Sequence, residues 1–91
     1  MNKIKVKNST NKNGNAIPNQ FIIDEKWSLR FQSYDSIIAI KYKGGATVID
    51  CDYWDYSVTT RKYRNQFLGE TTAETLKKIK SGEYHFEKLN G

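Results

Sequence analysis

A chain of 91 residues forms at most one domain with one modest core, which excludes a second domain. Its 37% hydrophobic and 27% charged residues are typical of neither a membrane protein nor a disordered chain. Fifteen Lys and Arg against ten Asp and Glu give a net charge of +5, and this sign favours polyanionic partners.

The sequence predicts a soluble, cytoplasmic protein that has no membrane partner. No apolar run approaches the roughly 18 residues that a membrane span needs. Lysines near the N-terminus have no apolar segment behind them, so we expect no secretory signal there. Cys51 is the single cysteine and cannot form an internal disulfide, which agrees with a reducing compartment. We do not expect dimerisation through Cys51, and the sequence leaves the oligomeric state open.

The first 20 residues predict an edge strand and then a long loop. In residues 3–7, Ile4 and Val6 alternate with lysines, the pattern of a strand with one dry face, and lysines discourage edge-to-edge pairing. Residues 8–20 hold five Asn, a Gly and the single Pro18. This composition predicts an Asn-rich loop.

Residues 21–50 predict a meander of antiparallel strands. A hairpin should join residues 21–23 to residues 27–34, and alternation assigns Trp27, Leu29 and Phe31 to the core face. An isoleucine-rich central strand follows over residues 37–42. A turn at Lys43-Gly44-Gly45 leads into a further strand over residues 46–50.

Residues 57–82 predict a basic segment of two short helices. Ser57, Thr59 or Thr60 could cap the first helix, and Gly69 is placed to end it. The second helix has a capping box at Thr71 and Glu74, an apolar stripe at Ala73, Leu76 and Ile79, and a terminal Gly82. A final strand or tail follows. The predicted fold is therefore α+β in a single domain over residues 1–91: an antiparallel sheet of four or five strands with two short C-terminal helices packed on one face.

Catalytic signals are weak, and we expect no enzyme and no cofactor. A Cys51–His85 pair lacks the base and oxyanion groups that an activated thiolate needs. Asp50, Asp52 and Asp55 could hold a divalent cation, but their spacing is not that of a calcium loop and Asp is common in turns. We therefore predict no metal site, and the sequence contains no glycine-rich phosphate loop.

With catalysis set aside, a binding surface is the remaining functional interpretation. The basic residues of the two-helix segment could neutralise phosphates, and Asn65 or Gln66 could reach base edges. A solvated helix face is the alternative explanation for the same charges. The predicted partner- or nucleic-acid-binding residues are Arg61, Lys62, Arg64, Asn65, Lys77, Lys78 and Lys80. An aromatic and acidic contact is predicted at Asp52, Tyr53 and Asp55, while Trp54 could belong to this surface or, as we favour, to the core.

The pattern of aromatic, hydroxyl and aliphatic residues over 31–69 resembles a family of small proteins encoded by tailed bacteriophages and prophages. The stretches FQSYDSIIAI, YWDYSVTT and KYRNQFLG carry the resemblance. The matching residues are Phe31, Ser33, Tyr34, Ile38, Ala39, Trp54, Asp55, Tyr56, Ser57, Thr59, Thr60, Tyr63, Phe67 and Leu68, although Tyr63 itself stands where His is frequent in that family.

The resemblance implies a non-catalytic protein that acts inside the bacterial host. The first hypothesis is an anti-CRISPR-type inhibitor that binds a host defence protein or ribonucleoprotein and occludes it or its nucleic-acid groove. The second is a DNA- or RNA-binding accessory protein of phage replication or regulation. The basic, aromatic composition of the matching stretch is compatible with both.

Overall fold

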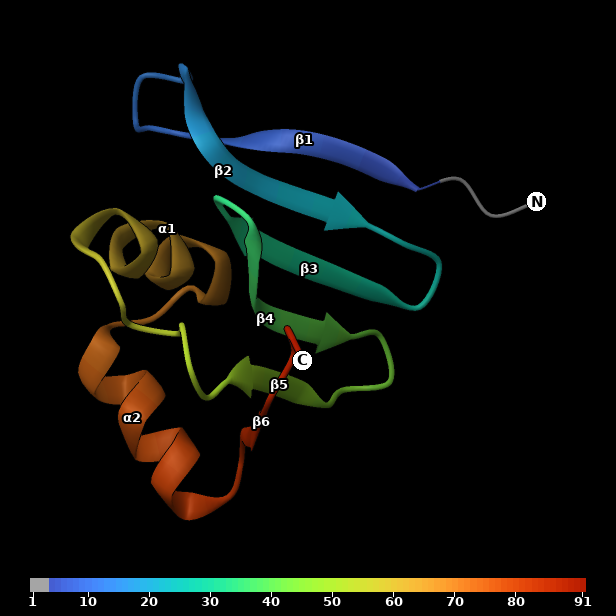
Figure 1. Ribbon diagram of the computed structural model, residues 1–91, viewed down its shortest axis with the longest axis vertical. Coiled ribbons are helices and arrows are strands. Elements are labelled where there is room, and N and C mark those ends of the chain that lie inside the picture. Colours follow the sequence, from blue (N-terminus) through green and yellow to red (C-terminus); the bar gives the residue numbers. More distant parts are fainter. Residues whose placement is uncertain (1–3) are drawn as a thin grey trace.

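The computed structural model describes residues 4–91 as six strands and two helices (Figure 1). The elements in chain order are β1 (Lys5–Thr10), β2 (Ala16–Asp24), β3 (Ser28–Ser33), β4 (Ser36–Tyr42), β5 (Thr47–Asp50), α1 (Val58–Leu68), α2 (Thr72–Ser81) and β6 (His85–Glu87). The predicted residue Lys3 of the first strand lies outside the described residues.

The strands form a single sheet in the order β1-β2-β3-β4-β5-β6. β1 to β5 are an antiparallel meander, as predicted, but β6 pairs in parallel with β5, with Ile49 opposite Phe86. The α+β class is confirmed. The prediction of four or five strands, all antiparallel, is wrong, because a three-residue strand after the helices joins the sheet edge.

The predicted loop over residues 8–20 is mostly strand. β1 continues to Thr10 and β2 begins at Ala16, so only residues 11–15 form the connection. Pro18 lies where the β1–β2 register shifts and precedes the first β2–β3 pair, Gln20 with Ser33. Its missing N–H therefore removes no ladder hydrogen bond, which is how this strand accommodates proline.

The core lies between the sheet and α1. Phe31, Ile38 and Tyr63 form its buried centre, and the Phe31 and Phe67 rings stack with their centroids 5.8 Å apart. The prediction for Trp27 is wrong: its side chain is 68% exposed. β3 begins one residue later, at Ser28, so the alternation that holds for Leu29 and Phe31 does not extend back to Trp27.

Both helices begin and end where the sequence predicts. The Ser57 hydroxyl accepts from the Thr60 N–H at the start of α1, and Gly69 ends the helix with a φ of 71°. Thr71 and Glu74 form the expected capping box of α2. The apolar stripe of α2 is largely exposed, however, and Thr75 is the buried residue of this helix. Among residues 4–91, neither helix has the length and apolar composition needed to cross a membrane.

Candidate nucleic-acid interface

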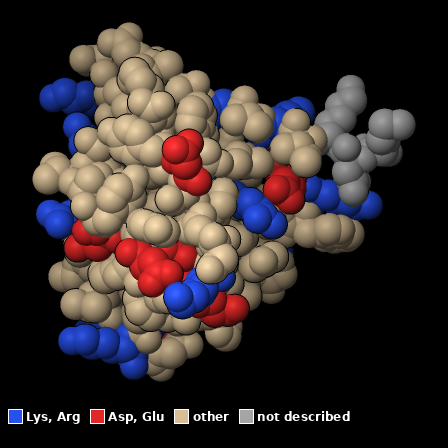
Figure 2. All heavy atoms as spheres, viewed as in Figure 1, with Lys and Arg blue, Asp and Glu red and all other residues tan. Residues whose placement is uncertain are grey.

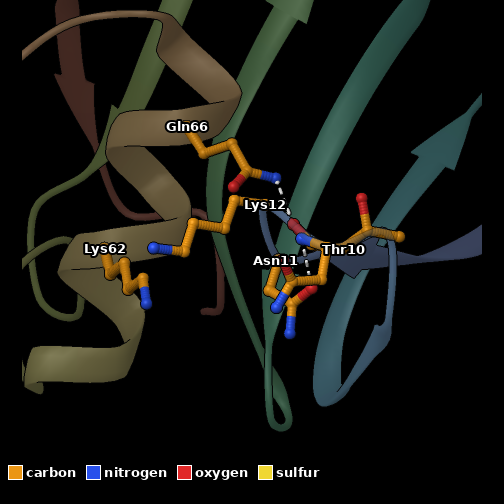
Figure 3. A pocket seen from close by; sticks show the side chains of 6 residues that line it. Thr10, Asn11, Lys12, Lys62 and Gln66 are labelled. Carbon is orange, nitrogen blue, oxygen red and sulfur yellow. Dashed lines mark hydrogen bonds between the residues drawn. The ribbon is translucent and has the colours of Figure 1, made fainter.

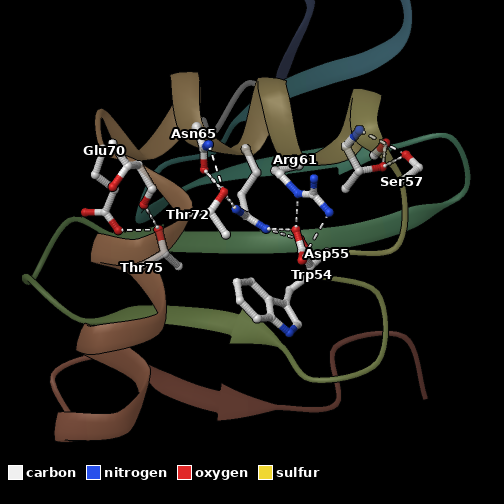
Figure 4. Close-up of polar contacts among 12 residues, drawn as sticks. Trp54, Asp55, Ser57, Arg61, Asn65, Glu70, Thr72 and Thr75 are labelled. Carbon is white, nitrogen blue, oxygen red and sulfur yellow. Dashed lines mark hydrogen bonds and ion pairs between the residues drawn. The ribbon is translucent and has the colours of Figure 1, made fainter.

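Arg64, predicted to face a partner, is fully buried. Figure 4 shows the residues that its guanidinium meets: Trp54, Asp55, Asn65 and Thr72. This guanidinium donates to the Trp54 carbonyl, to Asp55 at 3.0 Å and to the Thr72 hydroxyl at 2.9 Å. The group also stacks over the Trp54 ring, 4.7 Å from the ring centroid. Arg64 therefore joins α1 to the β5–α1 linker and to α2, and it is not available to a ligand.

Asp55 is the acid that binds this arginine. Its carboxylate also accepts from Arg61 at 2.8 Å. Although burial raises its pKa, the hydrogen bonds from Arg61 and Arg64 hold the pKa of Asp55 below its ordinary value. Asp55 and the half-exposed Arg61 are thus already paired with each other, which leaves neither charge free for a partner.

Asn65 and Trp54 also have structural roles. The Asn65 side chain accepts from Arg64 at 2.8 Å and donates to Thr72 at 3.1 Å, so it cannot turn toward a base edge without breaking these bonds. Trp54 packs against the core cluster and meets Phe86 edge to face at 6.2 Å. Our preferred assignment of Trp54 to the core agrees with these contacts.

The α2 lysines lie among carboxylates. Lys78 donates to Glu70 at 2.8 Å, and Glu70 also accepts from Thr75 and from Tyr84. Burial and the bond to Glu70 raise the pKa of Tyr84 to about 12. Lys77 borders a shallow opening that Glu74 and Glu83 also line. Lys80 is exposed. These carboxylates would oppose a phosphate, so the C-terminal part of the predicted basic surface is electrostatically mixed.

The acidic residues before α1 form a turn. The buried Asp50 carboxylate accepts the backbone N–H groups of Asp52, Tyr53 and Leu89 at 3.2, 2.7 and 2.8 Å. Asp52 itself lies 3.7 Å from Lys88. Within residues 4–91, no three His, Cys, Asp or Glu side chains are grouped in a way that could hold a metal ion. Tyr53 is partly exposed and meets Tyr56 edge to face at 5.7 Å.

A polar opening lies between α1 and the β1–β2 connection (Figure 3). We call it the basic groove; it has a volume of about 550 Å³ and is lined by Thr10, Asn11, Lys12, Asn13, Lys62 and Gln66. Figure 3 shows Lys12 and Lys62 projecting into the same opening from opposite walls. Neither ammonium has a carboxylate partner in the described part of the chain, and no acid lines the groove.

The wall that carries Lys12 is a turn closed by hydrogen bonds. The Asn11 side chain accepts from the N–H groups of Asn13 at 2.9 Å and Asn15 at 3.0 Å. Gly14 adopts a φ of 80°, a conformation that favours glycine. Gln66 on α1 donates to the Thr10 carbonyl at 2.9 Å and ties the two walls together. The groove is therefore preformed, which lowers the entropic cost of binding an anion.

Positive charge that is free to bind is carried by lysine. Arg30, Arg61 and Arg64 all form ion pairs. The described lysines without an ion pair are Lys5, Lys7, Lys12, Lys26, Lys41, Lys62, Lys77 and Lys80. In the view of Figure 2, Lys and Arg are spread mostly around the margin. Lys7 lies opposite Ile22, which packs on the core, so Lys7 and Lys5 add charge to the helix side of β1.

Of the predicted contact residues, Lys62 lies in this groove, and so does Gln66, which we expected to reach base edges. Arg64 is buried, and the half-buried Asn65 is held by Arg64 and Thr72. The sequence reasoning missed Lys12, Asn11 and Asn13, although the Asn-rich composition marked their segment as unusual. A lysine inside a turn-forming asparagine cluster was the available signal. No sequence rule indicated that this turn would face α1.

Comparison with protein families matches most of the chain. The model of a family described as a family of unknown function, DUF8033, matches residues 4–83. No curated protein and no solved structure matches the chain.

Proposed function

This chain belongs to the DUF8033 family of unknown function, and we propose that it binds the phosphate backbone of a nucleic acid through the basic groove, without cutting it. The observation that supports this proposal is the pair of unpaired ammonium groups, Lys12 and Lys62, in a preformed opening without acids. Lysine is a strongly hydrated point charge that neutralises phosphate without reading base identity. Binding should therefore depend little on sequence.

Salt dependence tests the proposal. We would measure the affinity for a fluorescently labelled oligonucleotide between about 50 and 200 mM KCl, because each neutralised phosphate releases counterions. For the Lys12→Ala, Lys62→Ala double variant, we expect weaker binding and a slope of log K against log [salt] that is shallower by about 1.4 for a single strand.

The matched control is Lys77→Ala with Lys80→Ala, which removes the same charge from α2. We expect it to change the slope much less, because Lys77 lies near Glu74 and Glu83 and neither lysine lines the groove. Equal effects of the two double variants would show that only net charge matters and would contradict the groove. Absence of binding by the wild-type protein even at the lowest salt would contradict the function itself.

A second candidate function is inhibition of a host defence complex by binding a protein surface. The observation that favours it is a set of three exposed tyrosines, Tyr34, Tyr53 and Tyr56, which we call the tyrosine cluster. Tyr53 meets Tyr56 edge to face, and the Tyr56 hydroxyl donates to the carbonyl of Ser33, the residue before Tyr34. Tyr34 is held in a left-handed conformation (φ 55°), and its N–H donates to Asn19 at 2.7 Å. Strained backbone conformations cluster at functional sites, and tyrosine is enriched at the hot spots of interfaces. The neighbouring Asp35 is exposed and acidic, which fits a basic protein partner better than a nucleic acid.

A nuclease-inhibition assay with a panel of CRISPR effectors tests this candidate. Tyr34→Asn removes the ring while asparagine tolerates the left-handed backbone, so inhibition should fall without loss of folding. Tyr42→Asn is the control, since Tyr42 has a similar exposure outside the cluster. If the wild-type protein inhibits no effector, this candidate fails. Inhibition that survives Tyr34→Asn would instead exclude the tyrosine cluster as the contact.

A further inference from the structure

β1 is one of the two edge strands of the sheet, and it is the longer of the two (Figure 1). In the described sheet it pairs with β2 alone, so every second residue directs its backbone N–H and C=O groups away from the sheet. The ladder with β2 is regular from Lys5 to Asn8, before the register shifts at Thr10. Residues 5–8 therefore offer a regular backbone edge to which a further strand can be added.

The side chains of this edge alternate between basic and apolar. Lys7 lies opposite Ile22, which packs on the core, so Lys5 and Lys7 lie on the helix side of the strand. Ile4 and Val6 then lie on the other side, because side chains alternate along a strand. They are 64% and 61% exposed. A strand added at this edge would meet two ammonium groups on one side and apolar groups on the other.

The two lysines have no acidic partner of their own. Asp24 lies opposite Lys5 in the register, but its carboxylate is 3.6 Å from Lys43. As far as the structure describes the chain, neither Lys5 nor Lys7 forms an ion pair. Opposite charges that face each other across neighbouring strands stabilise a sheet, and like charges destabilise it. The side of the edge that carries the lysines therefore favours carboxylates.

This pattern distinguishes among the possible occupants. The β1 strand of a second copy would bring lysines to lysines, which disfavours pairing of the two edges. A nucleic acid supplies phosphates for the lysines but has no row of amides for the free backbone groups of β1. An extended peptide with alternating acidic and apolar residues satisfies both lysines, the side chain of Val6 and the backbone edge.

We infer that β1 binds an extended peptide segment of this kind, which joins the sheet as a further strand. Main-chain hydrogen bonds hold a strand that is added in this way, and alternate side chains select it. The lysines that keep neutral and basic strands away from an edge thus make this edge selective for acidic ones. The regular edge is only about 13 Å long, so we expect a dissociation constant on the order of 100 µM. Residues 5–8 do not line the basic groove, so the two sites are separate.

A nuclear magnetic resonance titration of the full, isotope-labelled chain tests the inference, with the peptide Glu-Val-Glu-Val-Glu as the probe. The amide signals of β1 should shift, whereas those of Lys12 and Lys62 in the groove should not. Two further peptides carry N-methyl groups on either the Glu or the Val residues, which keeps the charge and removes alternate donors. One of them should bind at least about tenfold more weakly, and the other, whose methyl groups point away from β1, should bind nearly as well.

Charge reversal tests the role of the lysines. The Lys5→Glu, Lys7→Glu double variant should bind the acidic peptide at least about tenfold more weakly. It should bind Lys-Val-Lys-Val-Lys instead, and this gain of binding would also show that the variant is folded. The matched control is Lys77→Glu with Lys80→Glu, which changes the net charge equally on α2 and should leave both affinities nearly unchanged.

Four outcomes would overturn the inference. A wild-type protein whose β1 signals do not shift at millimolar peptide has no such site. Equal effects of the two double variants would trace binding to net charge. Unchanged binding of both N-methylated peptides would exclude backbone pairing. Shifts of the β1 signals with protein concentration alone would assign the edge to a second copy. None of these measurements involves nucleic acid, so a failure here differs from a failure of the proposed function.

Discussion

Replacement of Arg64 by alanine should destabilise the protein severely, although the sequence presents this residue as one of several surface bases. The guanidinium is fully buried and donates to four groups: the Trp54 carbonyl, Asp55, Asn65 and Thr72. Burial lowers the pKa of Arg64, while the bond to Asp55 raises it, and arginine stays charged under ordinary conditions. Truncation therefore leaves several buried acceptors without their donor.

The expected magnitude follows from these contacts. Removal of one partner of a buried ion pair costs about 3 to 5 kcal/mol. The Asp55 side chain keeps 30% of its exposure and retains Arg61, so the lower end, about 3 kcal/mol, applies. That is a large fraction of the roughly 5 to 15 kcal/mol by which a domain is stable. At about 4 to 8 °C per kcal/mol, Tm should fall by about 12 to 24 °C.

Thermal and urea unfolding, followed by circular dichroism, measure this change in free energy. Arg61→Ala is the control, because Arg61 binds the same carboxylate from a half-exposed position. Exposed ion pairs contribute little to stability, so this variant should unfold close to wild type. An Arg64→Ala protein within about 1 kcal/mol of wild type, or an equally costly Arg61→Ala, would refute the structural role assigned to Arg64.

Three further predictions concern stability, each measured by urea unfolding. The hydrogen bonds from Lys78, Thr75 and Tyr84 outweigh burial and lower the pKa of Glu70. The ionised Glu70 therefore stabilises the protein above its unfolded pKa of about 4.3, and this contribution is lost as pH falls through the folded pKa. In the Glu70→Gln variant, stability should therefore fall less steeply with acid. Gly69→Ala should lower the free energy of unfolding by about 1 kcal/mol, because Gly69 has a φ of 71°. Gly44→Ala is the control: a Cβ has equal space there and φ is not positive, so stability should hardly change. Ser57→Ala should cost about 1 kcal/mol through loss of the α1 cap, and a cost near zero would mean that Thr60 finds another acceptor.

The sequence predicts the local features of this fold well. Hydroxyl and glycine residues at the helix ends act within one turn, so Ser57, Thr71 and Gly69 could be assigned from spacing alone. The meander was also readable, because each of its strands pairs with its neighbour in the chain. The error at Trp27 has the same local origin, since alternation cannot tell where a strand begins.

Features that join distant segments could not be read in this way. The charge pattern of α1 does not distinguish Arg64 from Arg61, and only the return of the β5–α1 linker over the helix buries one of them. β6 is three residues long, too short for a periodic signal, and its partner lies beyond two helices. The basic groove depends on a turn and a helix that lie about fifty residues apart in the chain; Gln66 and Thr10, for example, are separated by 56 positions.

The parallel pairing of β6 with β5 also sets an order of assembly. The hairpins of β1 to β5 close short loops. The pairing of β6 with β5 instead closes across 37 residues, from Val48 to His85 (85 − 48), and the Asn90–Ile37 contact closes across 53 residues; both span the two helices. Contacts with a large loop-closure entropy tend to form after the folding transition state. The last strand should then join the sheet after the rest of the domain has folded. Loss of the contacts that Phe86 or Asn90 makes should therefore accelerate unfolding, while the folding rate stays nearly constant.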